Sequence, residues 1–153
     1  MIQLENRIPP LIVALVFGVL MWALDGRASL TQGPGWVRSL LVVSVAVIAL
    51  YFCIAGVLVF RSLKTTVNPL KPESASSLVT SGVYQITRNP MYLGFALFLV
   101  SWAIFLGSMW PVTGVLGFVL YLTRFQIIPE ERALISLFGS EFEDYAKAVR
   151  RWL

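Results

Sequence analysis

The chain has 153 residues, of which 58% are hydrophobic and 13% are charged. Soluble domains contain about 45–50% apolar and about 25% charged residues, so this composition is typical of a membrane protein. One cysteine, Cys53, and no histidine are present, which excludes a disulfide framework and argues against zinc or haem sites built on Cys and His. We therefore expect no metal, and any catalysis has to use carboxylates, Arg, Lys, Tyr or backbone groups.

Four apolar runs approach the length needed to cross a hydrocarbon core about 30 Å thick, which takes about 20 helical residues. The runs are Ile8–Leu24, Ser39–Phe60, Pro90–Leu106 and Trp110–Ile128. They are apolar on all sides, which is typical of transmembrane helices and unusual for the helices of a soluble domain. We predict an all-α integral membrane protein with about four transmembrane helices, in one membrane domain over residues 1–153.

The basic residues predict the orientation of these spans. With four spans both termini lie on one side of the membrane. Of the basic residues, only Arg27 and Arg38 then lie on the other side. The residues on the side of the termini are Arg7, Arg61, Lys64, Lys71, Arg88, Arg124, Arg132, Lys147, Arg150 and Arg151. The positive-inside rule then predicts cytoplasmic N- and C-termini, in a bacterial inner membrane or its equivalent. Because these residues flank apolar spans and form no patch, we expect no nucleic-acid partner.

Residues 1–81 form an N-terminal half of two spans and a cytoplasmic loop. Pro10 falls in the first turn of the first span, where its missing N–H has no cost. No clear cleavage site follows this span, so we interpret it as a retained anchor. Gly56 in the second span either allows close helix approach or is an ordinary membrane glycine. The proline-containing stretch from Arg61 to Ser81 predicts a cytoplasmic loop.

A polar segment runs directly into the third span at Arg88-Asn89-Pro90. Asn is favoured as an N-cap and Pro at the first helical position, so we predict that the helix begins at Pro90. The unpaired amides and partial positive charge of a helix start suit anionic groups. The alternative is that these residues only start a membrane helix.

The third and fourth spans are predicted to form a tight antiparallel hairpin, because Trp110 follows Gly107 almost at once. Gly114 and Gly117 would let the fourth span pack closely on a neighbour. Arg124 lies near the cytoplasmic end of this span, and its charge either extends to the lipid headgroups or points into a polar site.

After Pro129 the pattern becomes amphipathic. Glu130 and Glu131 fall in the first turn of a new helix, where negative charge is favoured, and Gly139 is a predicted C-cap. The segment Ser140-Glu141-Phe142-Glu143 reads as a capping box that begins a last helix.

That last helix has an apolar face, formed by Phe142, Tyr145, Ala146, Val149 and Trp152. Glu143 and Lys147 form a predicted i,i+4 ion pair on another face. The helix lies either on the membrane surface or over the cytoplasmic end of the hairpin.

Two motifs resemble a known family. The motif Gly82-x-Tyr84-x-x-x-Arg88-Asn89-Pro90-Met91-Tyr92-x-Gly94 resembles the Arg-His-Pro-x-Tyr-x-Gly segment of the isoprenylcysteine carboxyl methyltransferases. The motif Pro129-Glu130-Glu131-x-x-Leu134-x-x-x-Phe138-Gly139-x-x-Phe142-x-x-Tyr145, followed by Arg151-Trp152, resembles their C-terminal signature, and membrane phospholipid methyltransferases are similar in both places. The resemblance covers residues 82–153. Asn89 stands where the family usually has His, so no imidazole base is available there.

The resemblance implies a methyltransferase that uses S-adenosylmethionine in a cytoplasm-facing pocket. The acceptor would be a lipophilic small molecule or lipid-modified group (a carboxylate, thiol or lipid amine) that arrives from the bilayer, among membrane lipids. The implied cofactor-binding residues are Tyr84, Asn89, Pro90, Met91, Tyr92, Gly94, Glu130 and Glu131. The implied catalytic residues are Arg88, Arg124, Glu131 and Arg151. Of these, an arginine would orient an anionic acceptor through a bidentate pair.

Two other functions remain open. One is a non-catalytic membrane scaffold or lipid-binding protein with the same architecture. The other is an NADPH-dependent membrane reductase, because membrane sterol reductases are similar at the C-terminal end, although the small size and the glutamate pair argue against it. No Rossmann glycine fingerprint is present, which argues against a soluble-type methyltransferase domain. The oligomeric state and a gating role for the loop Lys64–Ser81 stay open.

Overall fold

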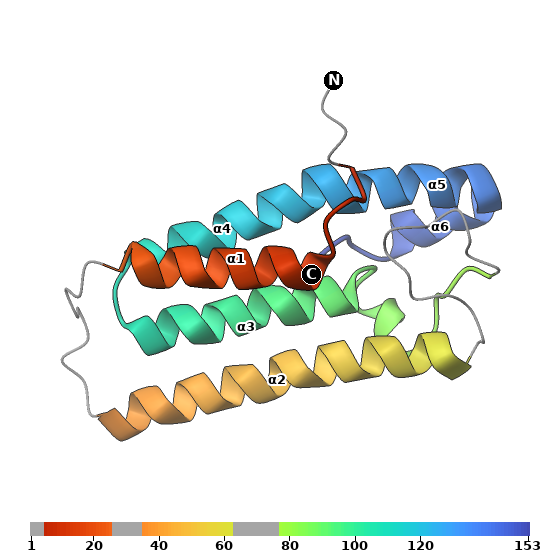
Figure 1. The fold of residues 1–153 in the computed structure, drawn as a ribbon. Helices are drawn as coiled ribbons and strands as arrows, with labels where there is room; N and C mark the ends of the chain where they lie inside the picture. The colour runs from red at the N-terminus through yellow and green to blue at the C-terminus, as the bar shows by residue number, and fades with distance from the viewer. Residues whose placement is uncertain (1–4, 26–34, 63–76) are drawn as a thin grey trace.

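The computed structural model describes residues 5–25, 35–62 and 77–153, and these residues form a helical bundle (Figure 1). The four long helices are α1 (Pro10–Ala23), α2 (Gly35–Ser62), α3 (Pro90–Leu106) and α4 (Trp110–Leu122). The shorter elements are η2 (Gly82–Gln85), η3 (Thr123–Ile127), α5 (Ile128–Phe138) and α6 (Ser140–Ala148). The described residues contain no strand, which confirms the predicted all-α class.

Two helical stretches are long and apolar enough to cross a membrane, namely Gly35–Arg61 and Trp110–Phe138. The helices α1 and α3 are apolar but shorter. Many large apolar side chains on the long helices point outward, among them Leu15, Leu40 and Leu120. Such a surface is expected of helices that face lipid. The number of spans and the side on which the termini lie stay predictions.

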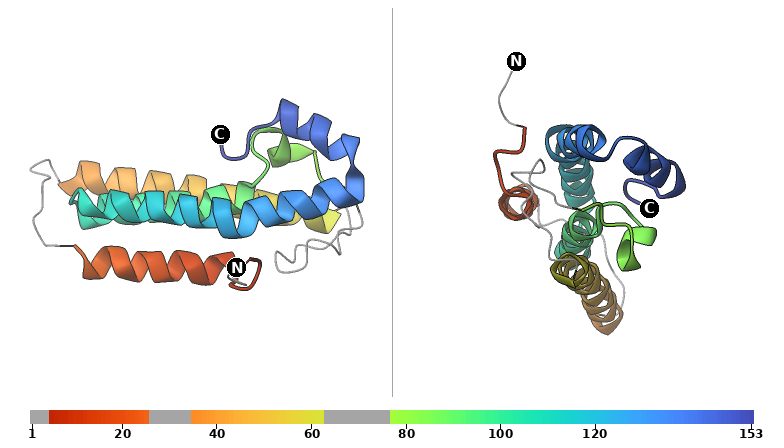
Figure 2. Two further views of the ribbon diagram at one scale, coloured as in Figure 1. Left: turned by 90° about the horizontal axis from the view of Figure 1, so that it is seen from above. Right: turned by 90° about the vertical axis from the view of Figure 1, so that its right-hand side faces the viewer.

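The helix α3 lies at the centre of the bundle, between α1, α2 and α4 (Figure 2). Its closest neighbour is α2, and glycines make this approach possible. A Cβ at Gly94 would overlap Cys53 Sγ, and a Cβ at Gly56 would lie 2.9 Å from Met91 Cγ. Gly56 is therefore a packing glycine, which decides between the two alternatives that the sequence left open.

The helix α4 packs on α1 through two further glycines, as predicted. A Cβ at Gly114 would overlap Met21, and a Cβ at Gly117 would lie 2.9 Å from the Phe17 ring. The tight turn between α3 and α4 is also confirmed, because Gly107 ends α3 with φ 77° and α4 begins at Trp110.

The helical path from α4 into α5 is continuous, so no separate helix begins after Pro129. The turn widens to π-helical geometry in η3, where the Ile128 N–H donates to the Thr123 carbonyl. A π-turn relieves the clash that a proline ring makes with the preceding helical turn. Proline also lacks the N–H that would bond the Phe125 carbonyl in an α-helix, and the Asn6 N–H donates to that oxygen at 3.1 Å.

The turn between α5 and α6 confirms one prediction and contradicts another. Gly139 ends α5 with φ 53°, as expected of a C-cap glycine. The prediction of a capping box at Ser140 is wrong, because Gly139 also occupies the N-cap of α6 and the Ser140 side chain makes no capping bond.

The predicted pair and apolar face of α6 also need correction. Lys147 pairs with Asp144 at 2.9 Å, and not with Glu143. The helix ends at Ala148, so Val149 and Trp152 of the predicted face lie beyond the end of the helix.

Candidate functional site

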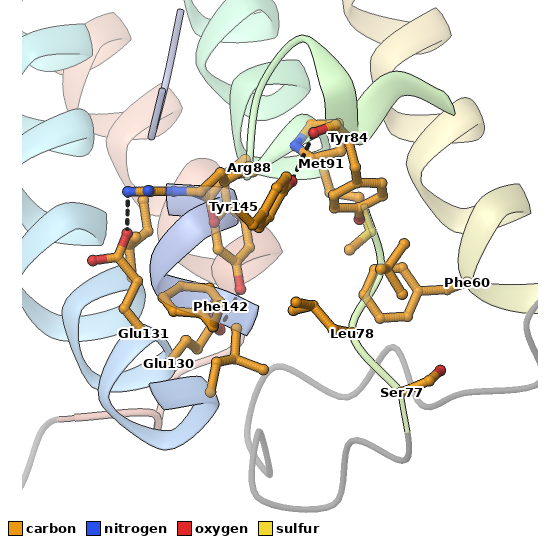
Figure 3. A pocket seen from close by; sticks show the side chains of 16 residues that line it. Phe60, Ser77, Leu78, Tyr84, Arg88, Met91, Glu130, Glu131, Phe142 and Tyr145 are labelled. Carbon is orange, nitrogen blue, oxygen red and sulfur yellow. Dashed lines mark hydrogen bonds and ion pairs between the residues drawn. The ribbon is translucent and has the colours of Figure 1, made fainter. Parts of the chain in front are cut away.

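A cavity of about 120 Å³ lies at the end of the bundle where α2 ends, α3 begins, and α5 and α6 fold over the gap (Figure 3). Residues from all of these elements line it, including Phe60, Tyr84, Tyr92, Glu130 and Phe142. The two sequence motifs, although separated by the α3–α4 hairpin, therefore form opposite walls of one pocket.

Glu131 holds two arginines in place. Its Oε1 accepts from Arg88 Nη2 at 2.8 Å and from Arg151 Nε at 3.0 Å, and its Oε2 accepts from Arg151 Nη2 at 2.6 Å. The Glu131 and Arg88 side chains are only 16% and 11% exposed, whereas Arg151 is 36% exposed. The hydrogen bond with Glu131 raises the pKa of Arg151. Glu131 thus ties α5 to the segment before α3 and to the C-terminal tail.

Arg88 is held from several sides but keeps one donor without an acceptor. Its Nη1 donates to the Ala146 carbonyl at 2.8 Å, and its guanidinium lies 5.9 Å from the Phe142 ring centroid. Its buried Nε has no hydrogen-bond partner among the described residues. A buried donor of this kind is costly unless a ligand or water bonds it, so Arg88 is suited to bind an anionic group in the pocket.

Glu130 has surroundings quite different from those of Glu131. Its Oε1 accepts from the Tyr92 hydroxyl at 2.5 Å and from Gln126 Nε2 at 2.7 Å. Neither partner carries a positive charge. Successive residues on a helix point about 100° apart, so one glutamate faces the arginines and the other lies beside the buried tyrosine on the pocket wall.

The C-terminal tail closes on the segment that precedes α3. The Arg88 N–H donates to the Arg150 carbonyl at 3.0 Å, and the Arg151 carbonyl accepts from Asn89 Nδ2 at 2.9 Å and from the Thr87 hydroxyl at 3.3 Å. Trp152 Nε1 donates to the Thr123 hydroxyl at 3.1 Å, which anchors the tail further.

Asn89 occupies the N-cap position of α3, as predicted, but its side chain does not cap the helix. It bonds the C-terminal tail instead, so the capping role is wrong. As a result the first-turn amides of Met91 and Tyr92 have no side-chain cap, and both residues line the pocket. Uncapped amides at a helix start are suited to bind an anionic group.

The helix α6 covers the open side of the pocket, which favours the covering position over one flat on the membrane. The Tyr145 hydroxyl donates to the Tyr84 carbonyl at 2.7 Å, and the Tyr84 ring packs edge-on against Phe60 at 5.4 Å. Burial raises the pKa of Tyr145 to about 12 and also raises the pKa of Tyr84. Both hydroxyls therefore stay protonated at neutral pH.

The structure brings most of the predicted site residues together. The predicted residues on the pocket wall are Tyr84, Arg88, Asn89, Pro90, Met91, Tyr92, Glu130 and Glu131. Arg151 reaches this group through Glu131. Two predicted residues lie elsewhere: Arg124 is 51% exposed and pairs with Glu5, and Gly94 packs against α2.

Several lining residues were not in the predicted site. One of them is Phe60, at the end of the second apolar run. Gln126 was also missed; it does not line the pocket but donates to Glu130, which it precedes by four residues, a spacing that places both on one helix face. Ser77 to Val79 also line the pocket. Most of the loop Lys64–Ser81, whose gating role the sequence left open, falls on residues 63–76, which lie outside the described residues. Within the described ranges, no cluster of three or more His, Cys, Asp or Glu side chains is placed to hold a metal ion.

Comparison with known proteins links this geometry to a family. The sequence model for phospholipid methyltransferases matches residues 37–141. An uncharacterized protein of Haemophilus influenzae is 44% identical over 63 residues, which are 41% of this chain and 100% of that protein.

Isoprenylcysteine methyltransferases are also similar. The protein-S-isoprenylcysteine O-methyltransferase of Schizosaccharomyces pombe is 37% identical over 75 residues, which are 47% of this chain and 30% of that enzyme. A probable protein-S-isoprenylcysteine O-methyltransferase of Oryza sativa subsp. indica is 38% identical over 84 residues, or 53% of this chain and 42% of that protein. The chain thus matches less than half the length of these two relatives. No solved structure matches it.

Proposed function

The chain belongs to the phospholipid methyltransferase family, and from this premise we propose that it is an integral membrane methyltransferase that uses S-adenosylmethionine to methylate a lipophilic acceptor. The observation that supports this proposal most strongly is the pocket itself. The start of α3 and the two glutamates of α5, which belong to different sequence motifs, line it together at the end of an apolar bundle. The names of these isoprenylcysteine methyltransferase relatives support both the reaction and a lipid-modified acceptor.

The chemical groups that line the pocket match the charged groups of the proposed cofactor. The buried Arg88 Nε and the uncapped amides of Met91 and Tyr92 would hold its carboxylate. The aromatic rings of Phe60 and Tyr84 offer π-faces to its cationic centre. The cavity of about 120 Å³ is smaller than the roughly 300–1,000 Å³ of typical ligand pockets. Binding therefore requires movement of the lining side chains or of α6.

Bound S-adenosylmethionine supplies an activated methyl group for in-line displacement, a reaction that depends on positioning and on exclusion of water. Glu131 contributes to positioning, because its ion pairs hold the guanidinium groups of Arg88 and Arg151 in place. The helix α6 and its Phe142 ring shield the pocket from water.

Glu130 is the carboxylate suited to take a proton from an acceptor. Both of its hydrogen bonds, from Tyr92 and Gln126, end on Oε1, so Oε2 is the atom we assign to a thiol or amine proton. A carboxylate acceptor would need no base, which agrees with a chain that has no histidine. Glu131 is less suited to this role, because arginines hold both of its oxygens.

The test is ligand-dependent stabilisation of the detergent-purified protein. Adenosylhomocysteine at about 100 times its dissociation constant should add about 2.7 kcal/mol and raise the melting temperature. NADPH should have no effect. Stabilisation by NADPH alone would favour the reductase, and no shift with either ligand at millimolar concentration would favour the scaffold, so both results contradict the proposal.

A further inference from the structure

Gln126 is a polar side chain buried in an apolar stretch of the chain. It is 3% exposed, and its neighbours in sequence are Phe125, Ile127 and Ile128. A buried amide costs free energy unless its polar atoms find hydrogen-bond partners. Gln126 Nε2 donates to Glu130 Oε1 at 2.7 Å, so the bond to Glu130 offsets part of the cost of burying an amide here.

The backbone around Gln126 places its amide behind the pocket wall. Gln126 belongs to η3, the π-helical turn that carries the chain from α4 into α5. Turns of this kind are frequent at functional sites. Glu130 lines the pocket and is partly exposed, whereas Gln126 does not line it. The amide therefore supports the glutamate without being in a position to contact a ligand in the pocket.

Two donors from different elements hold the Glu130 carboxylate. The Tyr92 hydroxyl of α3 and Gln126 Nε2 of η3 donate to Oε1 at 2.5 and 2.7 Å. Rotation of the carboxylate would break both bonds, so together they fix its plane. Because both bonds end on Oε1, the second oxygen, Oε2, is left for the acceptor.

Both donors to Glu130 are neutral, whereas Glu131 accepts from two arginines. The titratable groups around the pocket side of Glu130 are Tyr92 of α3, Tyr84 of η2, Tyr145 of α6, Arg88 before α3 and the adjacent Glu131. Of these, the cation Arg88 is bonded to Glu131. A bonded cation strongly disfavours protonation of a carboxylate. The neutral amide of Gln126 thus holds Glu130 without adding a charge that would prevent it from taking a proton.

We propose that Gln126 is a positioning residue for Glu130: together with Tyr92 it holds Oε1, so that Oε2 is kept ready to take a proton from the methyl acceptor. This inference rests on the proposed methyltransferase function. Oε2 receives the proton that the acceptor's nitrogen or sulfur loses as that atom gains the methyl group. The electrons of the broken carbon–sulfur bond remain on the sulfur of the cofactor, and Gln126 itself neither gains nor loses a proton.

The first test is an infrared titration of the detergent-purified full chain without cofactor. The carboxyl band of Glu130 is identified by its loss in Glu130→Gln, and its pH midpoint is compared between the unaltered chain, Gln126→Met and Gln126→Lys. Methionine removes the donor, so the midpoint should rise. Lysine adds a cation, so the midpoint should fall by at least about one pH unit. The control Ser101→Ala removes a buried hydrogen bond to the Val42 carbonyl, elsewhere in the bundle, and should leave the midpoint unchanged.

The second measurement is the pH profile of methyl transfer to a long-chain amine or thiol in lipid nanodiscs. The acidic limb of the profile should move up in Gln126→Met and down in Gln126→Lys, because only the ionised Glu130 takes a proton. The KM for S-adenosylmethionine should stay unchanged. A purely structural role of Gln126 would lower the rate at every pH and leave the limb in place. Stabilisation by adenosylhomocysteine shows that each variant folds.

Other outcomes overturn the inference in distinguishable ways. Equal midpoints in the unaltered chain and both Gln126 variants would show that Gln126 does not control Glu130. Shifted midpoints with an unshifted activity profile, or transfer to carboxylate acceptors only, would show that Glu130 is not the base. Absence of stabilisation by adenosylhomocysteine in the unaltered chain would instead refute the methyltransferase function, on which the infrared midpoints do not depend.

Discussion

Replacement of Glu131 by Gln should destabilise the fold strongly, because it leaves two arginines without their shared counter-charge. Removing one partner of a buried ion pair costs about 3–5 kcal/mol. The exposures of 16% for Glu131 and 11% for Arg88 place this pair near the lower limit of that range. Arg151 is 36% exposed, so its share is at most about 1 kcal/mol. We expect a loss of about 3 kcal/mol.

The matched control is Glu130→Gln on the neighbouring residue. Its two partners are the neutral Tyr92 and Gln126, so no cation loses its counter-charge. For a chain of this size 1 kcal/mol corresponds to about 2–4 °C in melting temperature. Glu131→Gln should therefore melt about 6–12 °C below the unaltered chain, and Glu130→Gln within a few degrees of it. Equal melting temperatures for the two variants would refute the different roles that we assign to the adjacent glutamates.

Substitutions at three further positions test other parts of the structure. Asn89→His should keep the bond to the Arg151 carbonyl and leave thermal stability nearly unchanged, whereas Asn89→Leu should cost about 1–3 kcal/mol; equal stability of the two would show that this bond is unimportant. Gly94→Val should lower the melting temperature through overlap with Cys53, at about 1–3 kcal/mol, and a normal melting temperature would contradict the close α2–α3 packing. Arg124→Ala should change stability by less than about 1 kcal/mol and leave adenosylhomocysteine binding intact; loss of that binding would return Arg124 to the site.

Much of the fold can be read from local sequence. Pro90 marks the start of α3 because proline is favoured in the first turn of a helix, where its missing N–H has no intrahelical partner. Gly107 and Gly139 mark helix ends because both adopt positive φ. Gly114 and Gly117 indicate close packing because only a residue without Cβ permits it.

The arrangement of the site is harder to predict, because it depends on residues far apart in the chain. Asn89 bonds the Arg151 carbonyl across 62 positions, and the Asn6 N–H bonds the Phe125 carbonyl in the turn that keeps α4 and α5 continuous. That π-turn also sets the directions in which Glu130 and Glu131 point. Two adjacent glutamates in a motif look equivalent in sequence. Their different surroundings follow only from the different directions in which successive residues of the helix point.

Arg124 illustrates the same limit. Arg124 lies seven residues before Glu131, a spacing at which an unbroken α-helix places both side chains on one face. The wider turn of η3 changes that phase, and Arg124 pairs instead with Glu5 at 2.8 Å. A charged side chain near the end of a span can either extend toward the lipid headgroups or point into a polar site, and the sequence alone does not decide between these two positions.

The most direct measurement is methyl transfer itself. The purified chain, reconstituted in lipid nanodiscs, would be incubated with methyl-labelled S-adenosylmethionine and a long-chain fatty acid or a prenylcysteine analogue. Label should enter the lipid-extractable fraction with the unaltered chain and fall at least tenfold with Glu131→Gln at a temperature where that variant stays folded. No transfer to the lipid fraction with any acceptor, together with no adenosylhomocysteine binding, would contradict the proposal that this pocket is a methyltransferase site.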